Sequence, residues 1–320
     1  MMTRSVLMAA VAVGATACGV DPGAGFRDGF PKADEVTMAV PGGGGKQPLV
    51  GEGTRRDGLD GDPSFFHGVT RGVSVLVNGG AVLVLGLVEE ITEYAPTSVT
   101  QDSATWGPHT NALSPNTWRF TVTRTAPNEY AYVLEGKPKT AADSEYRVVL
   151  SGAHVHTGHK LGTGTFLIDW DVAQTLPEHD ANVGRVQYTY ARPAAASTIS
   201  IDANFDDVRD GDTGQRVDAA YRYREYPGNG GALEFQVNKD LVTSGPALEV
   251  LTVKSRWLQT GAGRSDARVS GGDVPGASAT VSECWDSNFL SRFMTASFDP
   301  AIGYGSEAAC AFTTAEYSTL

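Results

Sequence analysis

Residues 62–96, DPSFFHGVTRGVSVLVNGGAVLVLGLVEEITEYAP, form the one long apolar stretch of the chain. Asp62 is a suitable N-cap residue, and Pro63 suits the first helical position. Pro96 prevents a helix from continuing past Tyr94. The stretch therefore predicts a single helix of roughly thirty residues.

This predicted helix is apolar on every side, because Asn78 is the one strongly polar residue between Val73 and Val88. A helix of that kind has to be enclosed, so we expect both Leu83 and Leu85 to lie in packed core. A membrane span is the weaker interpretation, since the apolar run is below about 18 residues and ends in acidic side chains. Two buried strands joined by a turn at residues 78–80 remain an alternative.

The rest of the chain consists of short segments in which apolar and polar residues alternate, as in half-buried strands. The clearest case is Ile199, Ile201, Ala203 and Phe205, which alternate with polar residues. Because no long helix intervenes, the pattern predicts an antiparallel meander of about ten strands, followed by a short helix near residues 287–294. Ten twisted strands tend to curl. We therefore expect a mainly β (α+β) fold: a curved meander or half-barrel wrapped around the one long apolar helix.

The apolar face of this sheet is rich in aromatic side chains, which we expect to line its interior. The strand at residues 247–259 is apolar on both faces and should be covered on both sides. An outer-membrane barrel is disfavoured, because Arg119, Asp202 and Arg222 would then face lipid. The expected lining residues are Tyr130, Tyr132, Tyr188, Tyr190, Tyr221, Tyr223, Trp170 and Phe205.

Residues 1–17 have the charged start and short apolar core of an export signal. The segment closes on Ala15-Thr16-Ala17-Cys18-Gly19, which resembles the lipobox of bacterial lipoproteins. The resemblance implies lipidation at Cys18, a cell-envelope location and, because Gly19 rather than Asp follows, passage to the outer membrane. Ala15 stands where that pattern usually has Leu, so cleavage without lipid stays open.

Residues 18–61 are rich in Gly and Pro and poor in large apolar side chains. They are expected to be a tether, with one edge strand possible at residues 36–40. Residues 62–320 are then expected to form a single helix-plus-sheet domain.

Two thiols remain if Cys18 is lipidated, and in an oxidising compartment Cys284 and Cys310 are expected to pair. Closing that loop restricts the unfolded chain by roughly 3–4 kcal/mol on the entropic model. The bond would attach the C-terminal tail to the body of the protein. Two free buried thiols are the alternative.

The composition argues against anionic partners. The chain has 25 basic and 37 acidic side chains, a net charge of −12. Nucleic acid and anionic membrane surfaces are therefore poor partners. No nucleophile elbow, phosphate-binding loop or dinucleotide motif is present, so we expect neither an enzyme nor a cofactor.

Three clusters have residue types that carry chemistry elsewhere. His154, His156 and His159 could hold zinc or copper, but no fourth ligand is nearby and an exposed, solvated hairpin turn explains them better. The acidic segment 206–214 lacks the ligand spacing of a calcium loop and is better explained as a hairpin turn. Asp169 and Asp171 flank Trp170 and could act as acid and base, but a polar strand end predicts the same pair.

Two function classes follow from this pattern. The first is a lipid-anchored, non-enzymatic binding or structural module whose interior is filled by its own helix, with an envelope protein or lipid as partner. The second is a carrier or sensor of a hydrophobic molecule such as a lipid or acyl chain. Over residues 62–320 the expected architecture is similar to the half-barrel of periplasmic lipoprotein carriers, a likeness of shape without a shared motif. An empty apolar space of hundreds of Å³ would distinguish the second class from the first.

Overall fold

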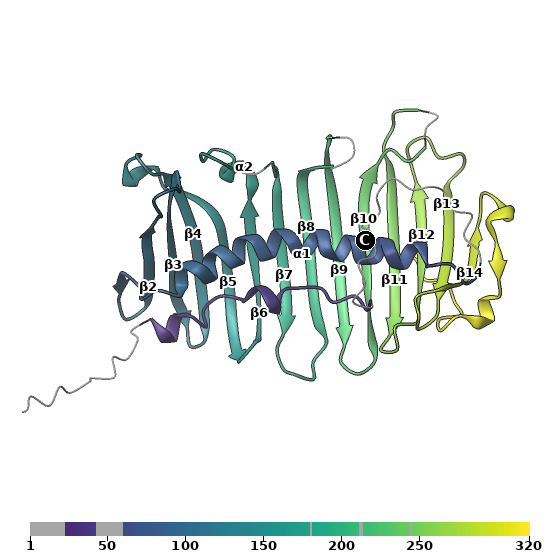
Figure 1. The fold of residues 1–320 in the computed structure, drawn as a ribbon, viewed down its shortest axis with the longest axis horizontal. Helices are drawn as coiled ribbons and strands as arrows, with labels where there is room; N and C mark the ends of the chain where they lie inside the picture. The colour runs from purple at the N-terminus through teal and green to yellow at the C-terminus, as the bar shows by residue number, and fades with distance from the viewer. Residues whose placement is uncertain (1–22, 43–59, 180, 211–213, 243–244) are drawn as a thin grey trace, which may run out of the picture.

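The computed structural model describes residues 23–42, 60–179, 181–210, 214–242 and 245–320. Within these ranges it contains one long helix, a short second helix and fifteen strands (Figure 1). The helices are α1 (Phe65–Thr92) and α2 (Trp170–Ala173). The strands are β1 (Ser98–Val99), β2 (Ser103–His109), β3 (Asn116–Ala126), β4 (Glu129–Pro138), β5 (Arg147–Gly158), β6 (Leu161–Asp169), β7 (Arg185–Arg192), β8 (Ile199–Arg209), β9 (Arg216–Tyr226), β10 (Gly230–Lys239), β11 (Glu249–Leu258), β12 (Gly263–Ser270), β13 (Ser278–Trp285), β14 (Ser291–Ala296) and β15 (Tyr304–Gly305).

The strands pair antiparallel in chain order from β1 to β15, so the sheet is one continuous meander with two free edges. The mainly β fold with one long helix is therefore confirmed, with more strands in the described residues than the ten or so expected. The alternation of apolar and polar residues does not predict β12, because the buried residues of this strand include Arg264 and Asp266. The short helix expected near residues 287–294 is wrong, because residues 287–288 form a turn and β14 begins at Ser291.

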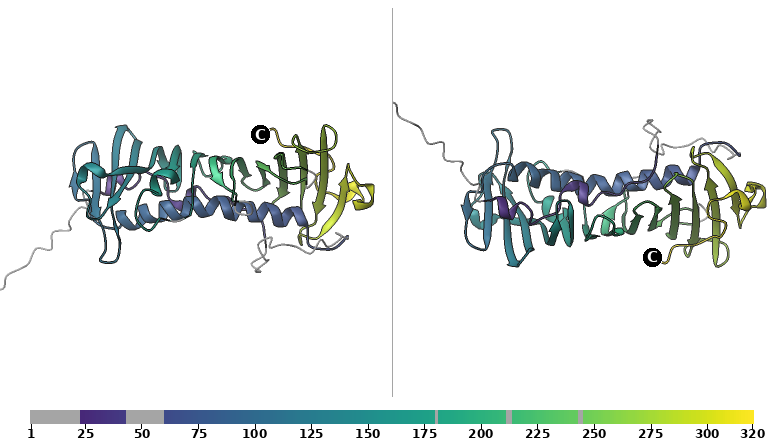
Figure 2. Two further views of the ribbon diagram at one scale, coloured as in Figure 1. Left: turned by 90° about the horizontal axis from the view of Figure 1, so that it is seen from above. Right: turned by 90° about the horizontal axis from the view of Figure 1, so that it is seen from below.

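The sheet is open and does not curl around the helix, which corrects the expected half-barrel. α1 crosses the strands instead of running along them, from β13 at one end to β2 at the other (Figures 1 and 2). Its 28 residues span about 42 Å, the width of about nine strands. A sheet can close around a helix only when the helix lies near the barrel axis, to which strands are tilted by about 40°.

The N-terminus of α1 begins at Phe65, later than Asp62 and Pro63 suggest. Ser64 is the N-cap, and its side chain accepts a hydrogen bond from the His67 amide at 3.2 Å. The buried carboxylate of Glu283 on β13 accepts the Phe66 amide at 2.7 Å. Pro63 instead forms an isolated bridge with Leu290, so tertiary pairing takes the predicted cap residues out of the helix.

Only one side of α1 is buried against the sheet. Leu85 is 1% exposed, whereas Leu83 is 57% exposed and Leu76 is 69% exposed. The expectation that α1 is enclosed on all sides is therefore wrong. A flat sheet touches a helix along one stripe, which leaves its outer side without sheet contacts.

Residues 23–42, which we call the strap, run alongside α1 over the same face of the sheet (Figure 1). Phe26, Phe30, Val36 and Met38 of the strap are buried in the main core. The expectation that residues 18–61 are only a tether is thus corrected for the strap. No strand is assigned at residues 36–40, and the predicted signal, Cys18 and residues 43–59 lie outside the described residues.

The disulfide between Cys284 and Cys310 is confirmed, with Cα atoms 5.7 Å apart. It holds the C-terminal tail near β11 and β12, where Arg256 donates to the Thr314 carbonyl at 2.7 Å. The opposite face of β11 packs into the main core through Val253 and Trp257. The expected covering of both faces is therefore confirmed around Arg256, but not at Leu248 and Leu258, which are each 38% exposed.

Candidate functional site: an apolar groove beside the helix

An apolar groove of about 480 Å³ lies between one flank of α1 and the sheet. Its helix wall consists of Val75, Leu76, Gly79, Gly80 and Leu83. The opposite wall comes from β6 to β10 and their connections, and polar side chains are confined to Asn182, Arg209 and Asp210. The apolar part of that wall is formed by Ile168, Trp170, Val183, Val186, Tyr188, Phe205, Val208, Val217, Ala219, Tyr221 and Val237.

Two glycines of α1 keep the groove open. A Cβ atom added to Gly79 would meet nothing within 4 Å, and one added to Gly80 would meet only Trp170 at 3.9 Å. Glycine in a helix interior costs about 1 kcal/mol relative to alanine. The chain therefore gives up helix stability at the place where larger side chains would fill the space.

Strand alternation supplies the opposite wall, since residues two apart on each strand face α1. Phe205 and Tyr221 come from neighbouring strands and pack edge to face, with ring centroids 5.1 Å apart. Tyr188 donates a hydrogen bond at 2.8 Å to the Val77 carbonyl of α1. Its hydroxyl is thereby satisfied, and its ring stacks on Phe166 with centroids 4.5 Å apart while forming part of the groove lining.

The eight aromatic residues predicted to line an interior divide into two groups. Trp170, Tyr188, Phe205 and Tyr221 line the groove. The others are buried near the strap or pack directly against it: the Tyr130 hydroxyl donates to the Gly25 carbonyl at 3.2 Å, and the Tyr223 hydroxyl lies 3.1 Å from the Ala39 backbone. The second group is Tyr130, Tyr132, Tyr190 and Tyr223.

Polar anchors hold the strap against α1. Asn78, the exception in the apolar run, accepts the Met38 amide at 2.8 Å and donates to the Met38 carbonyl at 2.9 Å. Glu89 accepts the Ala33 amide at 2.9 Å. The Asn78 side chain thus mimics one residue of a pairing strand, which explains a half-buried amide in an apolar helix.

On the strap, the side chain of Glu35 is half-buried among charged neighbours. Burial raises the pKa of the Glu35 carboxyl to about 7, while its hydrogen bond to the Lys32 backbone opposes that shift. Asp34 raises the pKa further, and Lys32 and Lys160 lower it through their charges. The charge of Glu35 also contributes to a raised pKa of Tyr190, whose main cause is burial.

The three histidines do not form a metal site in the structure. His154 is buried, its Nδ1 lies 2.7 Å from the Tyr190 hydroxyl, and burial lowers its pKa to about 4. His156 is half-buried and His159 is exposed. Across the described ranges no three His, Cys, Asp or Glu side chains are grouped to hold a metal ion.

Asp169 and Asp171 have structural partners. Asp169 caps α2 by accepting the Val172 amide at 2.9 Å, and it pairs with Arg185 at 3.0 Å. Asp171 accepts the Gly184 amide at 2.9 Å, and this bond lowers the pKa of its carboxyl. Both carboxylates therefore fix the connection from α2 to β7, which carries Asn182 and Val183 of the groove.

The acidic segment at 206–214 begins in the last residues of β8 and ends just before β9, the strand that pairs antiparallel with β8. Asp207 pairs with Arg216, and Asp210 pairs with Lys239 at 3.7 Å beside the groove. The sheet register shifts between Phe205 and Val208, which marks a bulge at this end of β8. Residues 211–213 lie outside the described part of the chain.

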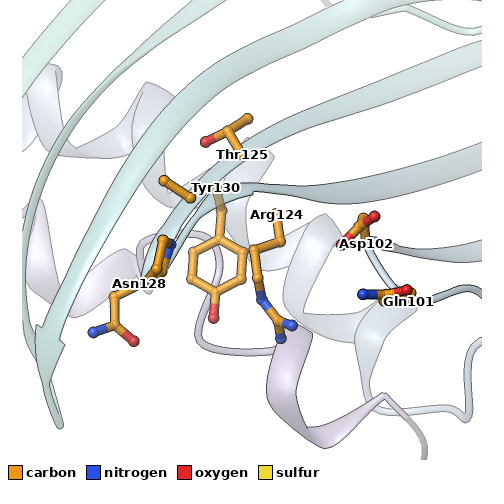
Figure 3. A pocket seen from close by; sticks show the side chains of 8 residues that line it. Gln101, Asp102, Arg124, Thr125, Asn128 and Tyr130 are labelled. Carbon is orange, nitrogen blue, oxygen red and sulfur yellow. The ribbon is translucent and has the colours of Figure 1, made fainter.

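A second hollow, of about 530 Å³, lies at the β3–β4 turn (Figure 3). Gln101, Asp102, Arg124, Thr125, Asn128 and Tyr130 are among the residues that line it. The Arg124 guanidinium stacks 4.9 Å from the Phe26 ring centroid of the strap, so this cation is already engaged. A polar surface built from turn residues is a weaker candidate than the apolar groove.

The sequence alone did not identify Val75, Leu76 and Leu83 as lining residues, because every side of α1 is apolar. The usable signal is the position of the glycines. Gly72, Gly79 and Gly86 recur every seven residues, which places them on one side of the helix. That spacing marks the side of α1 on which a Cβ atom added to these glycines would meet no atom within 4 Å.

α1 is long and apolar enough to cross a membrane by length and composition, with a mean hydropathy of 1.8 in its most apolar window. The side that carries Leu85 nevertheless packs on the sheet.

Comparison with known proteins found no matching family model, no matching curated protein and no matching solved structure.

Proposed function

We propose that the protein binds a hydrophobic molecule, such as a lipid or acyl chain, in the groove beside α1 and acts as its carrier or sensor. The observation that supports this is the volume of about 480 Å³ lined mainly by apolar and aromatic side chains. Ligand pockets of small molecules span roughly 300–1,000 Å³ and are mostly apolar. A purely structural module gains nothing from leaving Leu83 57% exposed beside such a space.

The size of the groove limits the ligand. A methylene group has about the volume of a water molecule in the liquid, about 30 Å³, so the groove holds roughly 15 of them. One acyl chain fits this volume. Asn182, Arg209 and Asp210 give the groove a polar border at which a head group can stay in water.

A filling variant with a matched control tests the proposal. Gly79→Leu places a side chain in the groove, whereas Gly72→Leu adds the same side chain one heptad earlier, outside the groove lining. Binding of a fluorescent fatty-acid analogue should weaken at least about tenfold in Gly79→Leu and stay unchanged in Gly72→Leu. Mass spectrometry of solvent extracts from the native protein should show a co-purified apolar molecule that Gly79→Leu loses.

Two results would contradict the proposal. One is equal probe binding by both glycine variants. The other is a native protein that carries no apolar molecule and does not bind the probe, which would favour the structural module.

We also propose that Cys18 carries lipid and anchors the protein in the outer membrane. The support is the lipobox-like sequence Ala15-Thr16-Ala17-Cys18-Gly19. Cys18→Ser should release the protein from washed membranes, because the acyl chains supply most of the bilayer affinity. Recovery of this variant in the membrane pellet at the wild-type level would refute the anchor.

A further inference from the structure

The outer side of α1 is an exposed apolar surface. Phe65, Val75 and Val82 are 56%, 55% and 43% exposed, and Leu76 and Leu83 continue the same surface into the groove. No charged residue occurs between Arg71 and Glu89. Large contiguous apolar surfaces of this kind mark contacts with a protein or a membrane.

Glycines on this side have no packing role within the described residues. Cβ atoms added to Gly68, Gly72, Gly79 or Gly86 would meet no neighbouring atom within 4 Å. Glycine weakens a helix in water but is more frequent in helices surrounded by lipid. This composition is therefore unfavourable for a helix face in water and ordinary for one that contacts lipid.

The hydropathy of α1 points in the same direction. Its most apolar window reaches the level of a membrane span, yet only 33% of that window is buried in the protein. The same helix cannot cross a bilayer while its other side packs on the sheet. It can lie along the membrane surface with its outer side among the lipid head groups and upper acyl chains.

We infer that the outer side of α1 is a membrane-docking face for a neutral, zwitterionic lipid surface. Charge selects this partner: the face has no cation between Arg71 and Glu89 to attract anionic lipid, and the chain carries a net charge of −12. This inference goes beyond ligand binding in the groove, although the two surfaces meet. Leu76 and Leu83 belong to both, so an apolar molecule would leave the bilayer for the groove without passing a polar side chain.

Flotation with phosphatidylcholine vesicles tests this face. All proteins carry Cys18→Ser, so that no acyl anchor contributes to binding. Val82→Asp places a charge on the outer side of α1 without touching the groove lining. Val155→Asp is the control, because Val155 is a comparably exposed apolar residue of β5, with an exposed fraction of 37%.

The Cys18→Ser protein and its Val155→Asp derivative should float with the vesicles, and Val82→Asp should reduce the bound fraction at least about tenfold. Replacing part of the phosphatidylcholine with phosphatidylglycerol should weaken binding of the first two proteins. All three should bind the soluble fatty-acid probe equally, which separates this inference from the proposed function.

Three results would overturn the inference: no flotation of the Cys18→Ser protein, equal flotation of Val82→Asp, or a dimer in sedimentation that Val82→Asp dissociates. The last result would mean that a second copy of the chain covers this face.

Discussion

The two flanks of α1 face the same aromatic sheet but are completed differently. On one flank the strap fills the space with Phe30, Val36 and Met38, and Asn78 fixes its backbone. On the other flank about 480 Å³ is left between Leu83 and the sheet. The comparison shows that the fold is held by the filled flank and the underside of α1. The open flank contributes little to that packing, and it is the flank to which we assign the proposed ligand.

The largest expected effect separates two leucines that are two residues apart on α1. Leu85→Ala should lower the free energy of unfolding by about 2–5 kcal/mol, because Leu85 is fully packed. Leu83→Ala should lower it by less than about 1 kcal/mol and weaken probe binding instead. Denaturant melts of both variants measure the difference. Equal losses would mean that the open flank contributes to the core as much as the buried side.

A smaller effect is expected where the strap meets α1. Asn78→Ala should cost about 1–3 kcal/mol, because it leaves the Met38 amide and carbonyl without their side-chain partner. Amide hydrogen exchange should accelerate in the strap more than in β6 or β7. Val75→Ala, on the open flank, is the control and should leave exchange of the strap unchanged. Uniform acceleration in both variants would show that the strap is not a separately anchored element.

The smallest expected effect concerns pH. The native pKa of Glu35 is about 7, above its ordinary value of 4.5, so the folded protein binds this proton more tightly than the unfolded chain does. The resulting stability is fully present below about pH 4.5 and is lost as the pH rises through about 7. Because the carboxyl is only partly buried, we expect a loss on the order of 1 kcal/mol between pH 5 and 8.

Melts across this pH range test the assignment to Glu35. Glu35→Gln should remove this component of the pH dependence, whereas Glu90→Gln, on the exposed side of α1, should retain it. The comparison of variants matters because His154 has a native pKa lowered to about 4 and contributes stability of the opposite pH dependence. An unchanged profile in Glu35→Gln would assign the dependence to other groups.

Much of the fold could be predicted from local pattern. Alternation identified the strands whose outward residues meet water, as with Asn204 between the inward-facing Ala203 and Phe205. It failed at β12, where Arg264 and Asp266 are buried under the C-terminal tail and pair at 2.8 Å. These charged residues are typical of a solvent-exposed strand face. Only the tertiary structure shows that the tail buries them.

The groove could be anticipated only in part. Four of its aromatic residues were predicted, because the inward face of each strand follows from its period. The side of α1 that lines the groove could not be predicted, because a helix that is apolar on every side does not indicate which side faces the sheet. The sequence pattern predicts a tether in place of the strap, because its anchors, such as Met38 against Asn78, are few and widely spaced among glycines and prolines.

The N-terminal cap of α1 depends on a residue far away in the sequence. Phe66 donates its amide to Glu283, 217 residues further along the chain, whereas each strand pairs with its immediate successor. Sheet growth is thus a series of local, rapid closures, but the first turn of the helix waits for one of the longest loops in the molecule. During synthesis α1 emerges before every strand that covers it. Its apolar surface needs protection until β13 arrives, so late contacts at that strand should set the rate at which the native state is completed.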